Sequence, residues 1–233
     1  MHLAGRWLAG WMVLVLWIGP PSRCAGAATG IVQCEGQTYT YLCLRSSVPG
    51  PRPAILLLHG AGDDPKNMVE AWSSLAAREG IVLIAPALPR TPAFEAMAPR
   101  VFRCVLEEVA RTTHLDSRRI FVFGNSMGGY LAYDALAFLS DRIAAVGVHA
   151  MGIAPEYDGI LDQADRKAPV AIYIGDRDPL VPLAGIRRTQ NLLERRGFPT
   201  RLTVLEHHDH DYYAVSGPVN ADAWAFFRLH PRP

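Results

Sequence analysis

The fold is decided by the stretch RIFVFGNSMGGYLAYDALAFL, residues 119–139. Its first part is a continuous apolar run, which is typical of a parallel strand buried on both faces. Its last part has small and apolar residues that favour a helix, and Ser126 lies where the two meet. Gly-x-Ser-x-Gly between a strand and a helix is typical of a nucleophile elbow, a sharp turn that exposes a serine hydroxyl. The competing interpretation is an ordinary strand-to-helix turn of small residues.

The elbow gives its two outer glycines a physical reason. We expect a turn so tight that Gly124 and Gly128 approach each other, so that a Cβ on either would clash. The strained backbone would then lift the Ser126 hydroxyl toward solvent. It would also place Ser126 at a helix N-terminus, where free N–H groups and the helix dipole favour developing negative charge.

Strands and helices alternate on both sides of this stretch. The further apolar runs that predict buried strands are residues 54–58, 81–86, 144–150 and 169–175. The amphipathic stretches that predict helices are residues 67–79, 99–114, 127–139, 186–196 and 220–229. We expect an α/β fold: a doubly wound, mostly parallel sheet with helices on both faces and an antiparallel strand pair at residues 31–44. The long connections, residues 87–99 and 151–168, should lie at the carboxyl ends of strands, where open sheets bind ligands.

Composition and charge exclude some partners. The chain has 233 residues, of which 23 are Lys or Arg and 22 are Asp or Glu, with a formal net charge of +1. A nucleic-acid-binding protein would show a basic excess or a basic stripe, and neither is present, so no nucleic-acid partner is expected. The length is typical of one domain, and we expect it to be residues 28–233.

The N-terminus is typical of a secretory signal peptide. His2 and Arg6 precede an apolar run of 11 residues from Leu8 to Ile18, and a membrane-spanning helix needs about 20. Small residues follow, with an A-x-A pattern that ends at Ala27. We therefore expect residues 1–27 to be removed, no stable membrane span, and a secreted or periplasmic protein. The alternative is an uncleaved N-terminal anchor on a membrane-associated interaction protein.

The cysteines are interpreted in the light of export. Cys24 would leave with the signal peptide, and Cys34, Cys43 and Cys104 would remain. Because Cys34 and Cys43 both lie in the first strand region, they are the expected disulfide in an oxidising compartment. Cys104 has helical spacing among apolar residues, and we expect it to be a buried, small hydrophobic residue.

A serine needs a base that accepts its proton, and the base needs an acid that orients it. In this fold the chain order is serine, then the acid, then histidine. Asp178, in YIGDRDPLVP, follows a buried strand and is the expected acid, with Asp176 as the alternative. His210 is the expected base and His208 the second choice, both in EHHDHDYY.

Two further expectations follow from the histidine cluster and from the loop HGAGDD. The cluster at residues 207–210 could bind a metal, but a loop supplies a fixed ligand geometry poorly, so no metal and no cofactor are expected. The oxyanion of an acyl-transfer reaction needs two donors. The expected donors are the backbone N–H groups of Met127 and of Ala61, which lies in HGAGDD. His59 is expected to support that loop.

Four stretches together resemble the alpha/beta-hydrolase superfamily: LLLHGAGDD, GNSMGGYLAYDAL, IGDRDPLVP and HHDHDYYAVSGPVNADAWAFF. They are most similar to small secreted esterases related to dienelactone hydrolase, feruloyl esterase and polyhydroxybutyrate depolymerase. The resemblance covers residues 38–229 and implies a triad of Ser126, Asp178 and His210 with Ala61 and Met127 as oxyanion donors. Ser126 stands where dienelactone hydrolase proper has cysteine, so the resemblance does not carry over that enzyme's specific reaction.

The resulting expectation is a serine esterase that acts on a small or polymer-derived carboxylic ester. The elbow is also similar to that of prolyl-oligopeptidase-like peptidases, so a small peptidase or amidase is the first alternative. A non-catalytic binding protein on a hydrolase scaffold is the second. Phe94, Met97, Met151 and Tyr157 in the two long connections are candidates for the pocket lining, and each could equally be ordinary packing.

Overall fold

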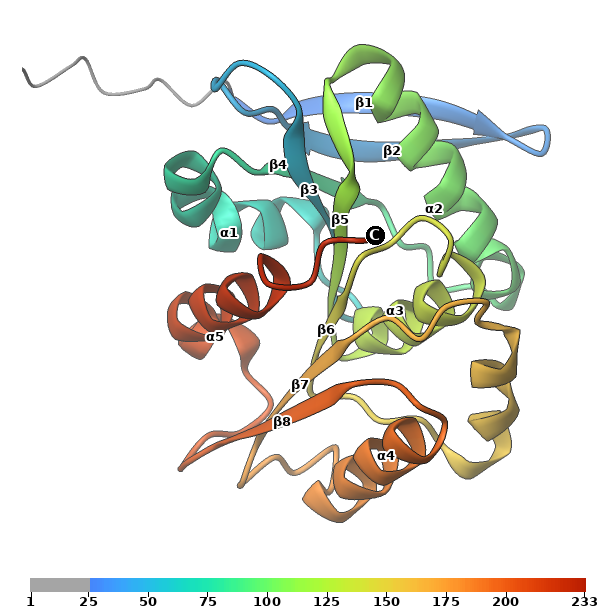
Figure 1. The fold of residues 1–233 in the computed structure, drawn as a ribbon, viewed down its shortest axis with the longest axis vertical. Helices are drawn as coiled ribbons and strands as arrows, with labels where there is room; N and C mark the ends of the chain where they lie inside the picture. Colours follow the sequence, from blue (N-terminus) through green and yellow to red (C-terminus); the bar gives the residue numbers. More distant parts are fainter. Residues whose placement is uncertain (1–25) are drawn as a thin grey trace, which may run out of the picture.

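The computed structural model describes residues 26–233, and the strands of this part form one eight-stranded sheet (Figure 1). The strands are β1 (Ala28–Cys34), β2 (Gln37–Leu44), β3 (Arg52–Leu58), β4 (Val82–Pro86), β5 (Leu115–Asn125), β6 (Val146–His149), β7 (Val170–Gly175) and β8 (Thr200–Leu205). Their order across the sheet is β1-β2-β4-β3-β5-β6-β7-β8. The strands from β4 to β8 along this order run parallel, whereas β1 and β2 are antiparallel to their neighbours. The expected α/β fold with an N-terminal antiparallel pair is confirmed.

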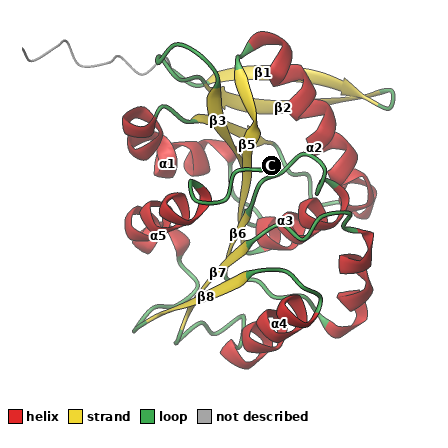
Figure 2. Ribbon diagram, in the orientation of Figure 1, coloured by secondary structure: helices red, strands yellow, loops and turns green. Residues whose placement is uncertain are grey.

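Helices cover both faces of the sheet (Figure 2). They are α1 (Pro65–Glu79), α2 (Pro92–Thr112), α3 (Met127–Phe138), α4 (Leu183–Arg195) and α5 (Tyr212–Phe227), with the short 3-10 helix η1 (Pro155–Gln163). Helices α1 and α5 pack on one face, and α2, α3 and α4 pack on the other. Strand β3 shows why two cores form, because Leu56 and Leu58 belong to the α2–α3 core while Ile55 and Leu57 belong to the α1–α5 core.

The long connections contain more helix than expected. The Pro- and Ala-rich segment 87–99 was expected to be a loop, yet α2 begins at Pro92. Thr91 is the N-cap, and its side chain accepts a hydrogen bond from the Phe94 N–H, while Pro92 needs no donor at the first helical position. Helix α5 likewise begins at Tyr212, capped by Asp211, rather than at residue 220.

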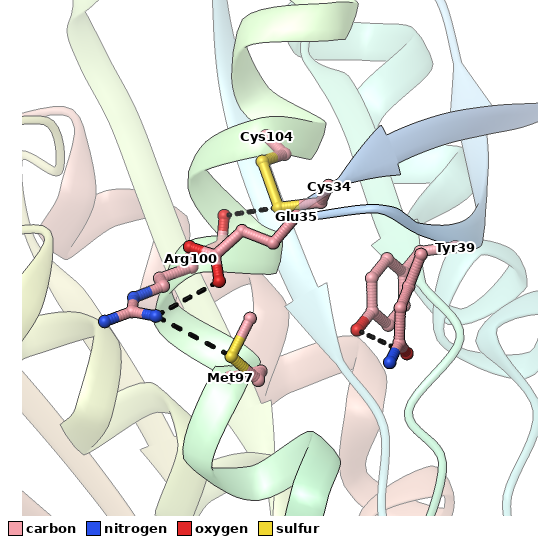
Figure 3. The surroundings of a disulfide bond; sticks show 7 residues. Cys34, Glu35, Tyr39, Met97, Arg100 and Cys104 are labelled. Carbon is pink, nitrogen blue, oxygen red and sulfur yellow. Dashed lines mark hydrogen bonds and ion pairs between the residues drawn. A yellow bond between two sulfur atoms is a disulfide. The ribbon is translucent and has the colours of Figure 1, made fainter.

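The disulfide differs from the expected one. Cys34 bonds to Cys104, which joins the end of β1 to α2 across 70 residues of sequence (Figure 3). Among the described cysteines, Cys43 is the one without a disulfide; it is buried, and burial raises the pKa of its thiol. The register explains the error: Cys34 pairs with Gln37 at one end of the β1–β2 ladder, and Cys43 pairs with Ala28 at the other. Six residues along a strand separate them by about 20 Å, and a disulfide needs a Cα–Cα distance below about 7 Å. In the structure the Cα atoms of Cys34 and Cys104 lie 6.0 Å apart.

The expected signal peptide, residues 1–27, lies outside the described residues except for its last two positions, and Cys24 lies outside them too. Within residues 26–233, no helix is both long and apolar enough to cross a membrane.

Candidate active site

Ser126 occupies a strained backbone position at the junction of β5 and α3. Its φ is 52° and its ψ is −119°, in a region that residues with a Cβ rarely adopt. The Ser126 N–H donates to the His149 carbonyl at 2.9 Å, and the Ser126 carbonyl accepts from Gly129 N–H at 2.7 Å and from Tyr130 N–H at 3.2 Å. The turn is therefore held by hydrogen bonds on both sides, which keep the strained residue in place.

The glycines of the elbow stand where no Cβ fits. A Cβ on Gly124 would lie 2.1 Å from the Gly128 carbonyl oxygen, as the sequence led us to expect. A Cβ on Gly128 would instead lie 2.0 Å from the carbonyl oxygen of Leu58, at the end of β3. Gly128 is thus required by the neighbouring strand rather than by Gly124. Through it, α3 starts in direct contact with the segment that leads into the loop at residues 59–64.

His210 and Asp178 meet at Ser126, although they come from different connections. The His210 Nε2 lies 2.9 Å from Ser126 Oγ, and the His210 Nδ1 lies 2.7 Å from Asp178 Oδ2. A carboxylate only accepts hydrogen bonds, so Nδ1–H donates to Asp178 and Nε2 is left as the acceptor for the Ser126 hydroxyl. The Asp178 side chain is fully buried, and that of His210 is 22% exposed. This arrangement can remove a proton from the serine.

The loop after β7 fixes the Asp178 carboxylate. Its Oδ1 accepts the N–H groups of Leu180 at 2.8 Å and Val181 at 2.9 Å, while Oδ2 accepts from His210. Burial alone would raise the pKa of Asp178, but the hydrogen bonds from Val181, His210 and Leu180 together hold that pKa below its usual value. The carboxylate is therefore ionised when it faces the imidazole. Asp176, the alternative acid, is exposed and has no side-chain hydrogen bond to a described residue.

The other histidines of the loop point elsewhere. His207 is exposed, has a φ of 57°, and its Nδ1 lies 2.8 Å from the Arg177 guanidinium. His208 is 8% exposed, and its ring lies 5.8 Å from the ring of His149 beneath the site. Of the three, His210 is the one beside Ser126. In the described part of the chain, no cluster of His, Cys, Asp and Glu is arranged to hold a metal ion.

The two expected oxyanion donors flank Ser126. Met127 is the first residue of α3, so its N–H has no partner within the helix. A Cβ on Gly60 would lie 3.7 Å from the Cβ of Ser126, which brings the loop that contains Ala61 beside the serine. Neither the Met127 nor the Ala61 N–H donates to another described residue. Both are thus free to bind a negatively charged oxygen.

His59 and Tyr213 hold the loop at residues 59–64 from two sides. The buried His59 ring donates from Nδ1 to the Gly60 carbonyl at 2.8 Å and accepts the Leu88 N–H at Nε2, 3.2 Å away. On the other side, the Tyr213 hydroxyl at the start of α5 donates to Asp63 Oδ2. The Tyr213 contact joins this loop to the segment that carries His210, and sequence analysis missed it.

A buried polar pair beneath the elbow was also missed. His149 is fully buried at the end of β6, and its Nδ1 donates to Asn125 Oδ1 at 2.9 Å. Burial, with smaller contributions from the nearby His208 and His210, lowers the pKa of His149 to about 3. The signal in the sequence was a single polar residue at the carboxyl end of each of two apolar runs, Asn125 and His149.

The candidate lining residues divide between two places. Tyr157 of η1 packs edge-on against Tyr130 of α3, with ring centroids 5.7 Å apart, and it is 48% exposed. Met151 lies against the start of α3, since its Cβ is 2.8 Å from the position of a Cβ on Gly129. Phe94 is buried and Met97 half-buried, and both line a separate hollow beside the β1–β2 hairpin.

The family model described as "Alpha/beta hydrolase family" matches residues 55–231. Among curated proteins, a bifunctional acetylxylan esterase/xylanase, XynS20E, from Neocallimastix patriciarum is 26% identical over 135 residues. That match covers 55% of this chain and 20% of the relative, so the chain spans about a fifth of the relative's length.

Solved structures share the fold at low sequence identity. An S-formylglutathione hydrolase from Agrobacterium tumefaciens has a TM-score of 0.71 at 17% identity and matches 88% of this chain and 95% of its own. Est1E from Butyrivibrio proteoclasticus has a TM-score of 0.67 at 15% identity, over 86% and 98% of the two chains. A candidate dienelactone hydrolase from Klebsiella pneumoniae has a TM-score of 0.74 at 16% identity, over 88% and 100%.

Proposed function

Because the chain belongs to the alpha/beta hydrolase family, we propose that it is a secreted serine esterase that cleaves carboxylic esters through an acyl-enzyme intermediate on Ser126. The observation that carries the proposal is the unbroken line of hydrogen bonds from Ser126 Oγ to His210, at 2.9 Å, and from His210 to Asp178, at 2.7 Å. A hydroxyl is a weak nucleophile until a base accepts its proton, and this line supplies the base and the group that orients it.

The proposed reaction has two halves. In the first, Ser126 Oγ attacks the ester carbonyl carbon while His210 Nε2 accepts the hydroxyl proton. Asp178 stabilises the imidazolium, and the N–H groups of Ala61 and Met127 bind the oxyanion. The carbon–oxygen bond to the alcohol then breaks, and His210 returns the proton to the leaving alcohol. In the second half, His210 takes a proton from water while the water oxygen attacks the acyl carbon; the bond to Ser126 Oγ then breaks, His210 returns the proton to Oγ, and a carboxylic acid leaves.

Export is part of the proposal. The Cys34–Cys104 bond supports it, since structural disulfides persist in oxidising compartments and are rare in the cytosol. N-terminal sequencing of the exported protein tests it, with a new terminus just after Ala27 as the expected result. A mature protein that still begins at Met1 would contradict cleavage.

The activity is tested by a hydrolysis screen. p-Nitrophenyl esters of increasing acyl length, feruloyl esters and acetylated sugars are compared with aminoacyl amides, and Ser126→Ala is the control. Acetylated sugars are included because the curated relative is named for acetylxylan esterase activity. We expect ester hydrolysis that disappears in Ser126→Ala. Faster cleavage of aminoacyl amides than of any ester would favour the peptidase alternative, and equal activity in Ser126→Ala would contradict the mechanism.

A further inference from the structure

A hollow of about 440 Å³ lies between the β1–β2 hairpin and the first turns of α2, apart from Ser126. Its lining includes Glu35, Gln37 and Tyr39 from the hairpin and Thr91, Phe94 and Met97 from the other side. Figure 3 shows Glu35, Tyr39 and Met97 around this region, next to the disulfide. The volume lies within the range of about 300–1,000 Å³ that is usual for small-molecule sites.

The hollow opens on the same edge of the sheet as Ser126. Strand β2 pairs antiparallel with β4, with Tyr41 opposite Pro86, so the start of β2 projects beyond the carboxyl end of β4. In the sheet β4 neighbours β3, and β3 neighbours β5, which ends at the serine. From β2, which carries the hairpin wall of the hollow, to β5 there are three strand spacings, or about 15 Å. The contact from the His59 ring to Leu88, one residue before the lining residue Pro89, connects the two places.

The walls of the hollow are braced. The Cys34–Cys104 bond fixes the end of β1 to α2, and Glu35 next to it pairs with Arg100 of α2 at 3.1 Å. Arg100 Nη1 also contacts Met97 Sδ at 3.8 Å, as Figure 3 shows. A site whose walls are fixed before the ligand arrives loses less conformational freedom on binding.

The chemistry of the lining suits a neutral ligand with an apolar face and several hydroxyl groups. The rings of Tyr39 and Phe94 lie 6.1 Å apart and form an apolar wall. The Tyr39 hydroxyl donates to Gln37 Oε1 at 3.3 Å, which leaves the Gln37 amide N–H groups as donors. The Thr91 Oγ1 accepts the Phe94 N–H, which leaves its own proton as a further donor.

The charges around the hollow do not favour an ionic ligand. Glu35 offers carboxylate oxygens as acceptors, and its charge is balanced by the paired Arg100. A hydroxyl group both donates and accepts, so a ligand rich in hydroxyl groups matches this mixture of donors and acceptors, whereas a phosphate or an ammonium group does not.

We propose that this hollow binds a sugar unit, so that the esters the protein cleaves are acyl esters of a neutral oligosaccharide. The inference rests on the proposed esterase activity of Ser126 and adds the nature of the alcohol. The sugar unit lies in the hollow while an ester carried further along the same oligosaccharide lies at the serine.

The test fills the hollow and compares two substrates. Ala93 lines it and is exposed at the second residue of α2, so Ala93→Trp occupies the space at little cost to the fold. Ala110→Trp is the matched control, because Ala110 is exposed on the same helix and about 25 Å away along its axis. Gln37→Ala removes only the amide donors. The substrates are acetylated xylo- and cello-oligosaccharides and p-nitrophenyl acetate, which carries no sugar.

For Ala93→Trp we expect kcat/KM on the acetylated oligosaccharides to fall by about tenfold or more, with p-nitrophenyl acetate within about twofold. Gln37→Ala should lower kcat/KM on the acetylated oligosaccharides by a smaller factor. Ala110→Trp should leave kcat/KM unchanged for both substrates. The inference is overturned if simple esters are cleaved but no oligosaccharide ester is, or if Ala93→Trp leaves the two substrates in their original ratio. If Ser126→Ala hydrolyses p-nitrophenyl acetate as fast as the wild-type protein, the proposed function is overturned instead.

Binding is measured separately from catalysis. Unesterified xylotetraose and cellotetraose are titrated into Ser126→Ala and followed by NMR. We expect shifts of the Gln37 side-chain amide that saturate with sugar and are absent in the Ser126→Ala, Ala93→Trp double variant. No shift with either sugar would overturn the assignment of the hollow, whatever the esterase assay shows.

Discussion

At the scale of single residues, His149 supports the elbow twice. Its carbonyl accepts the Ser126 N–H, and its ring donates to the Asn125 side chain. Burial and the neighbouring histidines lower the pKa of His149 to about 3. The ring therefore stays neutral throughout the pH range in which the protein is expected to work. The second imidazole close to the serine is thus a structural support, and His210 is left as the proposed base.

Asp178→Asn tests the acid. The amide oxygen of the substituted side chain can still accept the Leu180 and Val181 N–H groups, which turns its NH₂ group toward His210. The imidazole must then place its proton on Nε2, where it can no longer accept one from Ser126. We expect kcat for p-nitrophenyl acetate to fall by about three to four orders of magnitude. Asp176→Asn is the control and should retain full activity; equal losses in the two variants would contradict the assignment.

Tyr213→Phe tests whether the contact with Asp63 positions the loop at residues 59–64, which carries the proposed oxyanion donor Ala61. Tyr213 is 37% exposed, so loss of its hydroxyl should leave the fold intact. We expect kcat to fall by about tenfold with KM nearly unchanged, because the proposed oxyanion donor in this loop would bind charge that develops only in the transition state. The affinity for a boronic acid that forms a tetrahedral adduct with Ser126 should fall in parallel. Asp63→Asn keeps an acceptor for the tyrosine and should lose less; unchanged boronate affinity in Tyr213→Phe would refute the positioning role.

At the scale of elements, sequence patterns predicted the strands better than the connections. Continuous apolar runs located β3, β4, β5 and β7 to within a few residues, because burial on both faces leaves little choice of residue. The start of α2 was missed, since Pro and Ala suggested a loop and the decisive contact, the Thr91 cap, involves a single side chain. The elbow motif, the chain order and the family resemblance together predicted Ser126, Asp178 and His210, and in the structure His210 lies within hydrogen-bonding distance of the other two.

Contacts between distant segments could not be predicted in this way. Asn125 and His149 each stand out as a polar residue after an apolar run, but the sequence does not show that they pair. The same holds for Tyr213 and Asp63, because each pair forms only after the sheet is assembled. The cysteine pairing failed for the same reason: the register of β1 on β2 and the path of α2 decide it, and neither is encoded in the spacing of the cysteines.

Helix α3 carries a buried carboxyl group whose effect on stability depends on pH. Asp134 is 5% exposed, and burial, with Glu95 nearby, raises its pKa to about 7. Between about pH 4 and pH 7 the folded protein holds a proton that the unfolded chain has released, so this group lowers stability as pH rises. We expect the free energy of unfolding of Asp134→Asn to be similar to that of the wild-type protein at pH 4 and a few kcal/mol higher at pH 8. Urea unfolding at both pH values measures this, and a variant less stable than wild type at pH 8 would contradict it.

At the scale of the whole molecule, a disulfide bond joins β1, at the antiparallel edge of the sheet, to helix α2. The Cys34–Cys104 bond closes a loop that contains β2, β3, α1 and β4. The bond therefore fixes β1, at the edge of the sheet, to α2, the helix that borders the hollow.

Removal of this bond should weaken the molecule without abolishing catalysis. Closing a loop of 70 residues reduces the entropy of the unfolded chain and corresponds to about 4 kcal/mol of stability. We expect the Cys34→Ser, Cys104→Ser double variant to melt at a clearly lower temperature and to hydrolyse p-nitrophenyl acetate normally in the cold. Cys43→Ser is the control, since Cys43 forms no disulfide with another cysteine of residues 26–233. Equal melting temperatures with and without a reductant in the wild-type protein would contradict this.

The central claim is that one serine is activated by one imidazole with one carboxylate behind it. The most direct measurement is peptide mapping by mass spectrometry after reaction with a fluorophosphonate, which modifies only an activated serine. We expect a single adduct on Ser126, formed far more slowly in His210→Ala and in Asp178→Asn and absent in Ser126→Ala. An adduct on another serine, or labelling of Ser126 at an unchanged rate in His210→Ala, would contradict the claim.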